Sequence, residues 1–173
     1  MVDAAKYRAS EMLRDGGEIE IRAFAPNDQA DLQAAVARTS SKSLYTRFFT
    51  VKRSFSERER EFFLNVNFKD HVALMAWTDE AGRKVIAGGA RYVVVEPGKA
   101  EVAFMVIDDY QGRGIGAALL AHLAMIGRAN GLKELVAEVL AENVSMLKIF
   151  ERSGLPMTTK HEYEVVHVTL ALT

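Results

Sequence analysis

The stretch EVAFMVIDDYQGRGIGAALL, residues 101–120, decides the fold, because a strand-like run leads there through a glycine cluster into a helix. Gly112, Gly114 and Gly116 let the backbone turn tightly and approach a ligand closely, since glycine has no β-carbon. The amides of this turn and of the first helical positions would lack intrahelical partners and would lie in the positive field of a helix start. We therefore expect an anion site here, of the kind that holds a diphosphate.

Two other interpretations of the glycine cluster are a purely structural turn and a Walker loop. The glycines could serve only to end a strand and begin a helix. A tight turn alone, however, does not require Arg113, which would add a mobile positive charge beside the loop. A Walker loop is excluded, because Gly116 is followed by two alanines where Lys and then Ser or Thr are needed.

A dinucleotide-binding fingerprint also fits the loop locally. Gly112, Gly114 and Ala117 satisfy its spacing, and Glu134 or Glu138 lies at about the distance of its ribose-binding acid. That fingerprint should open a series of parallel strand–helix units. The chain before the loop predicts short antiparallel connections instead, so this alternative is the weaker one.

The chain upstream of the loop predicts an antiparallel meander. Strand patterns occupy residues 71–77, 84–95 and 99–107. Asp79 to Gly82 separate the first two strands, and Pro97 and Gly98 separate the second pair. Connections this short join antiparallel neighbours.

The chain downstream of the loop predicts one parallel crossover. Apolar residues recur at helical spacing as far as Gly131, and residues 134–140 then form a strand pattern. Because a helix intervenes, we expect that strand to lie parallel to the one before the loop. Asn143 can cap a further helix that ends by Gly154, and residues 162–172 are typical of a last strand.

The N-terminal part predicts one strand and two helices. After a frayed or helical start, residues 18–23 alternate polar and apolar side chains as a half-buried strand does. Asn27 or Asp28 could cap a helix to about residue 38, and a second helix is expected over residues 56–64. The whole order predicts an α+β fold with a mixed, mostly antiparallel central sheet.

Length and composition limit the number of domains and the class of function. The chain has 173 residues, of which 49% are hydrophobic, which is enough for one core. We expect a single domain over residues 18–173 after an N-terminal extension, residues 1–17. The net charge of −1 leaves no general footprint for nucleic acid, and no run of residues suggests a membrane span or a secretion signal. The absence of cysteine excludes thiol nucleophiles and disulfides and fits a cytoplasmic protein.

At these motifs the sequence resembles a known family. VIDDYQGRGIGAALL, in which Gln111, Gly114 and Gly116 fill the pattern, resembles the acetyl-coenzyme A signature of the GNAT superfamily of N-acetyltransferases. AENVSMLKIFERSGL is similar to the family's helix containing Asn, and the resemblance covers about residues 17–172. DGGEIEIRAFAPND, SLYTRFF and VVHVTL are similar to bacterial protein lysine acetyltransferases of the Pat type. The resemblance implies helices on both faces of the sheet.

The resemblance also implies how acetyl-coenzyme A (acetyl-CoA) would be held. The strand before the loop would splay from its parallel neighbour, which frees backbone groups near Met105 and Val106 for the pantetheine arm. The diphosphate would lie on the loop and first helical turn, formed by Gln111, Gly112, Arg113, Gly114, Ile115, Gly116 and Ala117. Asn143 would contact the arm or a bound water, and Lys148 would approach the ribose phosphate.

The family's reaction is direct attack of an amine on the acyl thioester, and it needs a base. Glu101 matches the glutamate that Pat-type enzymes carry early on this strand, and a partly dry cleft would raise the pKa of its carboxyl. The alternative is an ordinary solvent-facing strand residue, and Glu138 is the reserve candidate for the base. Many relatives carry a tyrosine general acid where this chain has Phe150, and Tyr110 is expected to face elsewhere, so the acid is unassigned.

The sequence leaves three possibilities for what the protein acts on or binds. The resemblance favours a protein lysine as acceptor, with acyl-coenzyme A synthetases as the substrate type, acting as a monomer or homodimer. A small amine is the second possibility, and a non-catalytic domain that senses coenzyme A (CoA), as part of a longer polypeptide, is the third. No metal is expected, because His71, His122, His161 and His167 lack ligand spacing.

Overall fold

The computed structural model describes residues 3–38 and 67–172. Its strands are β1 Arg8–Met12, β2 Glu18–Ala23, β3 His71–Glu80, β4 Arg83–Glu96, β5 Lys99–Val106, β6 Glu134–Leu140, β7 Met157–Glu162 and β8 Val165–Ala171. Its α-helices are α1 Gln29–Ala37, α4 Ile115–Ala129 and α5 Val144–Glu151, with short 3-10 turns at Ala4–Lys6, Pro26–Asp28 and Asp108–Tyr110. The expected helix over residues 56–64 and the segment SLYTRFF lie outside the described residues.

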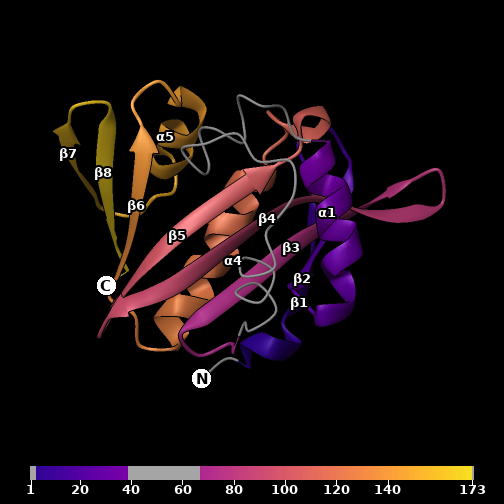
Figure 1. Ribbon diagram of the computed structural model, residues 1–173, viewed down its shortest axis with the longest axis horizontal. Coiled ribbons are helices and arrows are strands. Elements are labelled where there is room, and N and C mark those ends of the chain that lie inside the picture. The colour runs from indigo at the N-terminus through magenta and orange to yellow at the C-terminus, as the bar shows by residue number, and fades with distance from the viewer. Residues whose placement is uncertain (1–2, 39–66, 173) are drawn as a thin grey trace.

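The strands form one eight-stranded sheet in the order β1-β2-β3-β4-β5-β6-β8-β7. Strands β5 and β6 are parallel, and the other neighbouring pairs are antiparallel. The chain between β5 and β6 forms α4, so the predicted crossover is confirmed (Figure 1). The antiparallel meander β3-β4-β5 is also as predicted.

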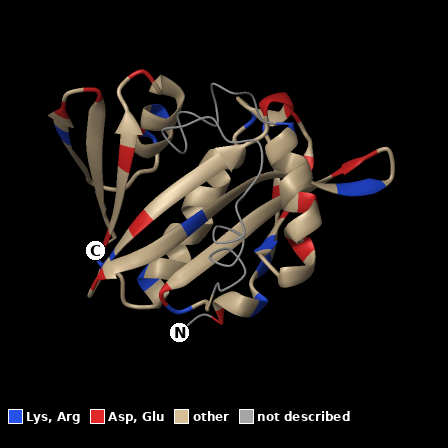
Figure 2. Ribbon diagram, in the orientation of Figure 1, with Lys and Arg blue, Asp and Glu red and all other residues tan. Residues whose placement is uncertain are grey.

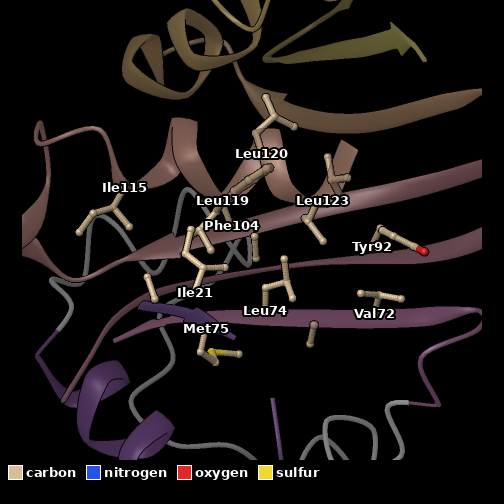
Figure 3. Packing of buried hydrophobic residues seen from close by; sticks show 14 of the residues in the cluster. Ile21, Val72, Leu74, Met75, Tyr92, Phe104, Ile115, Leu119, Leu120 and Leu123 are labelled. Carbon is tan, nitrogen blue, oxygen red and sulfur yellow. The ribbon is translucent and has the colours of Figure 1, made fainter. Parts of the chain in front are cut away.

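Helix α4 covers one face of the sheet and α1 covers the other (Figure 1). Figure 3 shows Leu119 and Leu123 of α4 lying over Leu74 and Tyr92 of the sheet, while Met75 points to the opposite side. Each of these two leucines is fully buried, which stabilises the fold by about 1.5–3 kcal/mol per side chain. The start of α4 lies close to the end of β5, because a β-carbon at Gly88 of β4 would meet Val106 at 3.3 Å and Ile115 at 3.4 Å.

Strands β5 and β6 diverge toward their C-terminal ends. Their pairing runs only from Lys99–Glu101 on β5 to Glu134–Val136 on β6. Farther along, Met105 and Val106 pair with β4 on their other side. Within residues 3–38 and 67–172, the edge of β5 that faces β6 therefore has no strand partner beside the start of α4, as the family resemblance implied.

The edge strands of the sheet differ from the prediction. The N-terminal start, expected to be frayed or helical, contains β1, which pairs with β2, and the C-terminal tail is the hairpin β7–β8 instead of one strand. Both missed strands are short and mostly exposed. Hydrophobic alternation is weak in such strands, because little of them is buried. Tyr7 and Glu11 bond the two ring nitrogens of His122 and so attach β1 to α4.

No helix within the described ranges is long and apolar enough to cross a membrane.

Candidate functional site

The loop between β5 and α4 has the open geometry that its glycines suggested. Gly112 has a φ of +77° and Gly114 a φ of +93°, in the left-handed region that favours glycine. A β-carbon added at either position would meet no heavy atom within 4 Å. The outer side of the turn is therefore accessible, and the glycines are required by the backbone conformation, with crowding playing no part.

The backbone amides of this loop are available to a ligand. Within the described residues, the amides of Gly112, Arg113 and Gly114 donate no hydrogen bond. The carbonyl of Gly114 accepts a hydrogen bond of 3.0 Å from the amide of Ala118 in α4. Helix α4 begins at Ile115 without a side-chain cap. The amides of its first turn have no intrahelical acceptor and lie at the positive end of the helix. An anion fits here better than any neutral group.

Gly116 has a packing role that the sequence did not indicate. A β-carbon at this position would lie 2.8 Å from Ile149 Cδ1 of α5. Gly116 and Ile115 are buried in the first turn of α4. The glycine thus lets the start of α4 pack closely against the C-terminal half of α5.

The side chain of Gln111 helps to shape the loop. Its Nε2 donates a hydrogen bond of 3.0 Å to the carbonyl of Val106, at the end of β5. One of the two backbone positions expected to be free for a pantetheine arm is therefore engaged by the loop. Gln111 acts here as a tie between the loop and β5.

Arg113 is held by a carboxylate, whereas the sequence predicted a mobile charge. Its Nε donates to Asp15 Oδ2 at 2.6 Å, and its guanidinium lies 5.0 Å from the centroid of the Tyr110 ring. Asp15 belongs to the turn between β1 and β2, 98 residues away in sequence. The hydrogen bonds from Arg113 and from the Gly17 amide hold the pKa of Asp15 below its ordinary value. Sequence spacing carries no signal for such a pair.

Tyr110 faces away from the loop opening, as predicted. Its hydroxyl donates to Glu80 Oε2 at 2.6 Å, and burial, followed by this bond, raises the pKa of the phenol. Arg38 forms two hydrogen bonds of 2.9 Å with Glu80 and one of 2.8 Å with Asp109. Tyr110 is thus engaged in a charged network at the end of β3.

Glu101 lies on an exposed part of β5. Its neighbour Val102 pairs with Tyr92 on the side of the sheet that α4 covers, so Glu101 is on the opposite face. It pairs with Val93 of β4, so Arg91, two residues farther along β4, is on the same face. In Figure 2, β5 carries a red, acidic band and the neighbouring β4 carries a blue, basic band. The expected partly dry cleft around Glu101 is not seen in the described part of the chain, because its side chain is exposed.

Arg91 of β4 and His71 of β3 lie on the same face of the sheet as Glu101. The sequence did not indicate either of them as a site residue. Burial lowers the pKa of Arg91 to about 10, although Glu101 acts in the opposite direction. Burial, and then the charge of Arg91, lower the pKa of His71 to about 4. An arginine within the apolar run of β4 was the available signal. The face therefore combines a neutral imidazole, a buried guanidinium and an exposed carboxylate.

Glu138, the reserve base, lies on the same face of the sheet on β6. It pairs with His167 of β8, whose Nδ1 is 3.6 Å from Glu138 Oε1 and whose Nε2 is 3.1 Å from Glu162 Oε2. Glu138 is therefore engaged with a histidine, whereas Glu101 has the buried arginine as its charged neighbour. Among the described residues, no group of three or more His, Asp or Glu side chains could hold a metal ion.

The residues expected on α5 have mixed surroundings. Asn143 caps the helix as predicted, since its Oδ1 accepts from the Met146 amide at 3.2 Å. Lys148 is exposed. Phe150 is 1% exposed and packs edge-on against Phe104, with ring centroids 5.9 Å apart. The position where many relatives carry a tyrosine is thus part of the core here.

Three comparisons relate this geometry to known proteins. The acetyltransferase (GNAT) family matches residues 39–155. Acetyltransferase Pat of Mycolicibacterium smegmatis is 35% identical over 144 residues, which are 82% of this chain and 42% of that protein. The chain thus spans less than half the length of this relative.

Solved structures show the same fold. The GNAT domain of S. lividans PAT superposes with a TM-score of 0.85 at 32% identity, over 95% of this chain and 96% of that one. The yncA protein of Salmonella typhimurium, solved with its cofactor acetyl-CoA, has a TM-score of 0.70 at 16% identity, over 90% of this chain and 94% of that one, which shows similarity of the fold alone. These matches confirm the predicted fold class and the resemblance to Pat-type proteins.

Proposed function

Because the chain belongs to the acetyltransferase (GNAT) family, we propose that it transfers an acetyl group from acetyl-CoA to an amine. The observation that carries this proposal is the open turn at the start of α4. Its left-handed glycines and its amides without protein acceptors lie beside the diverging strands β5 and β6. The thioester of acetyl-CoA would supply the acyl group.

The residues at the loop fit a diphosphate. The amides of residues 112–117 would donate to its oxygens, and the small side chains would let the ligand approach the backbone. Met105 and Val106, on the open edge of β5, would face the pantetheine arm, of which Met105 offers the position not tied to Gln111. Asn143 and Lys148 are assigned to the arm and the ribose phosphate on the family resemblance.

We assign the base to Glu101, directly or through a water molecule. Glu101 would first take a proton from the acceptor ammonium, and the freed nitrogen lone pair would then form a bond to the acyl carbon as the carbon–sulfur bond breaks. The second proton, lost as the amide forms, would pass to solvent. The exposure of Glu101 supports access for an acceptor that arrives from solvent. No thiol nucleophile is needed in this route, which agrees with a chain that contains no cysteine.

The leaving thiolate has no assigned acid. Phe150 carries no hydroxyl and is buried against Phe104, while the hydroxyl of Tyr110 is bonded to Glu80. The thiolate of CoA is a good leaving group and would take its proton from solvent. This feature separates the chain from relatives that use a tyrosine at this step.

For the acceptor we favour the side-chain amine of a protein lysine, such as one on an acyl-CoA synthetase. Two points support it: the similarity to Pat proteins, and the exposed side chain of Glu101, which suits a large substrate. A small amine is the alternative acceptor. A CoA-sensing domain without turnover is the alternative function.

Two measurements test the proposal. Calorimetry with acetyl-CoA reports binding, and release of thiol from acetyl-CoA in the presence of lysine peptides, acyl-CoA synthetases or polyamines reports turnover. Binding with turnover on a protein lysine is the expected result. Binding without turnover on any acceptor would favour the sensing role, and no binding at all would overturn the acetyl-CoA site.

A further inference from the structure

The cofactor loop is held at Tyr110 and Arg113 by charged side chains from distant parts of the chain. We call this set the loop brace, and it consists of Asp15, Arg38, Glu80, Asp109, Tyr110 and Arg113. Three of its members come from the loop region itself. The others come from the β1–β2 turn, the end of α1 and the end of β3.

At one end of the loop brace, Asp15 receives the side chain of Arg113. The Nε–Oδ2 distance is 2.6 Å, and Asp15 Oδ1 also accepts from the Gly17 amide at 2.8 Å. The β1–β2 turn therefore orients one oxygen of the Asp15 carboxylate, and the other oxygen accepts the hydrogen bond from Arg113. A β-carbon at Gly17 would lie 3.0 Å from Arg113 Nη2, so this turn fits closely around the guanidinium.

At the other end, Glu80 receives both Tyr110 and Arg38. The Tyr110 hydroxyl donates at 2.6 Å, and Arg38 donates at 2.9 Å to each carboxylate oxygen. Arg38 and Arg113 lie 6.0 Å and 5.0 Å from the centroid of the Tyr110 ring. Tyr110 directly precedes Gln111 and the glycines, so the brace holds the loop at both Tyr110 and Arg113.

A loop that contains two left-handed glycines needs such support. Glycine loses more conformational freedom on ordering than any other residue, and a ligand that orders the loop must offset that loss. Groups that hold the loop in its binding conformation before the ligand arrives reduce this cost and increase affinity. Exposed ion pairs contribute little to overall stability, so their effect would appear mainly in binding.

We propose that Asp15 and Glu80 are positioning residues for the cofactor, which hold Arg113 and Tyr110 so that the loop amides stay directed at the diphosphate. The proposal rests on the diphosphate site of the proposed function. It also makes the β1–β2 hairpin, which sequence analysis placed partly in an N-terminal extension, part of the cofactor-binding apparatus. Neither carboxylate is assigned a contact with the substrate.

The test compares Asp15→Asn and Glu80→Gln with Glu96→Gln. Glu96 forms an exposed ion pair of 2.9 Å with Lys99 at the β4–β5 turn, which makes it a matched control away from the loop. We expect Asp15→Asn and Glu80→Gln to raise the Kd of CoA and the KM of acetyl-CoA about 3- to 10-fold, with kcat nearly unchanged. Glu96→Gln should change neither, and Asp15→Glu should restore part of the affinity.

A second readout separates this proposal from the proposed function. Hydrogen exchange of the peptide covering residues 108–117, measured without ligand, should be faster in Asp15→Asn and Glu80→Gln than in the wild type and Glu96→Gln. If the wild type binds acetyl-CoA and the variants bind it equally well with unchanged exchange, the brace proposal is wrong. If the wild type fails to bind, the acetyl-CoA site is wrong, and faster exchange would still show that the brace orders the loop.

Discussion

The glycine loop and the sheet face around Glu101 are built in opposite ways. The loop draws its amides from consecutive residues, and its geometry follows from two glycines with positive φ. The face brings together Glu101, Arg91 and His71 from β5, β4 and β3. The loop can therefore bind a ligand through its backbone amides, with side chains serving only to hold it in place, whereas the chemistry of the face depends on particular side chains in register.

The largest expected effect is at the face. Glu101→Gln should lower kcat about 10²- to 10⁴-fold, because the amide cannot accept the proton. The Kd of acetyl-CoA should stay close to the wild-type value. Glu138→Gln is the matched control on β6, and a larger loss of kcat there than in Glu101→Gln would transfer the role to Glu138.

The next effect is at the loop. Gly114→Val should weaken acetyl-CoA binding about 5- to 150-fold, since a β-branched residue at a φ of +93° costs about 1–3 kcal/mol and would push the turn out of shape. Gly131→Val is the control, because Gly131 has a φ of +91° at the far end of α4. Calorimetry should show weaker binding for the first variant alone. Equal binding by both variants would argue against the loop as the diphosphate site.

A third change concerns Phe150, in the core where α5 packs against Phe104 of β5. Phe150→Tyr restores the residue type of many relatives, but Phe150 is 1% exposed, so the new hydroxyl would be buried. We expect a loss of about 1–3 kcal/mol in the free energy of unfolding and no rise in kcat. Urea unfolding and steady-state kinetics measure the two quantities. An increase in kcat would show that the hydroxyl reaches the leaving group.

The smallest effect is a pH dependence of stability that arises at the face. His71 has a folded pKa of about 4, below its ordinary value of 6.5, so the unfolded chain binds the proton more tightly. Stability from this group is complete above pH 6.5 and is lost as pH falls toward 4, by about 1 kcal/mol per pH unit at most. His71→Gln should flatten the dependence between these limits in urea titrations, and His161→Gln, at an exposed position, should not.

Much of the fold was predictable because its signals are local. Strand β6 occupies the predicted residues, α4 begins at the glycine cluster, and Asn143 caps α5. The errors are β1 and β7, whose polar, exposed residues form strands only because β2 and β8 offer them backbone partners. Pairing with a neighbouring strand overrides weak local preference there.

The site was predictable only in part, for the same reason. The glycine cluster was identified correctly as a tight turn, in which the structure gives Gly112 and Gly114 a positive φ. The mobile charge expected of Arg113 was wrong, because its partner Asp15 is 98 residues away. The cofactor contacts and the role of Glu101 stay predictions.

The sequence by itself determined the order of the elements from β3 to α5, the glycine loop and the family, because periodicity and turn residues are properties of neighbouring residues. Only the tertiary structure decided that Asp15 and Glu80 hold the loop, that Arg91 and His71 lie beside Glu101, and that Phe150 belongs to the core. These relations depend on sheet register and on helix packing. Both arise from contacts between residues far apart in the chain.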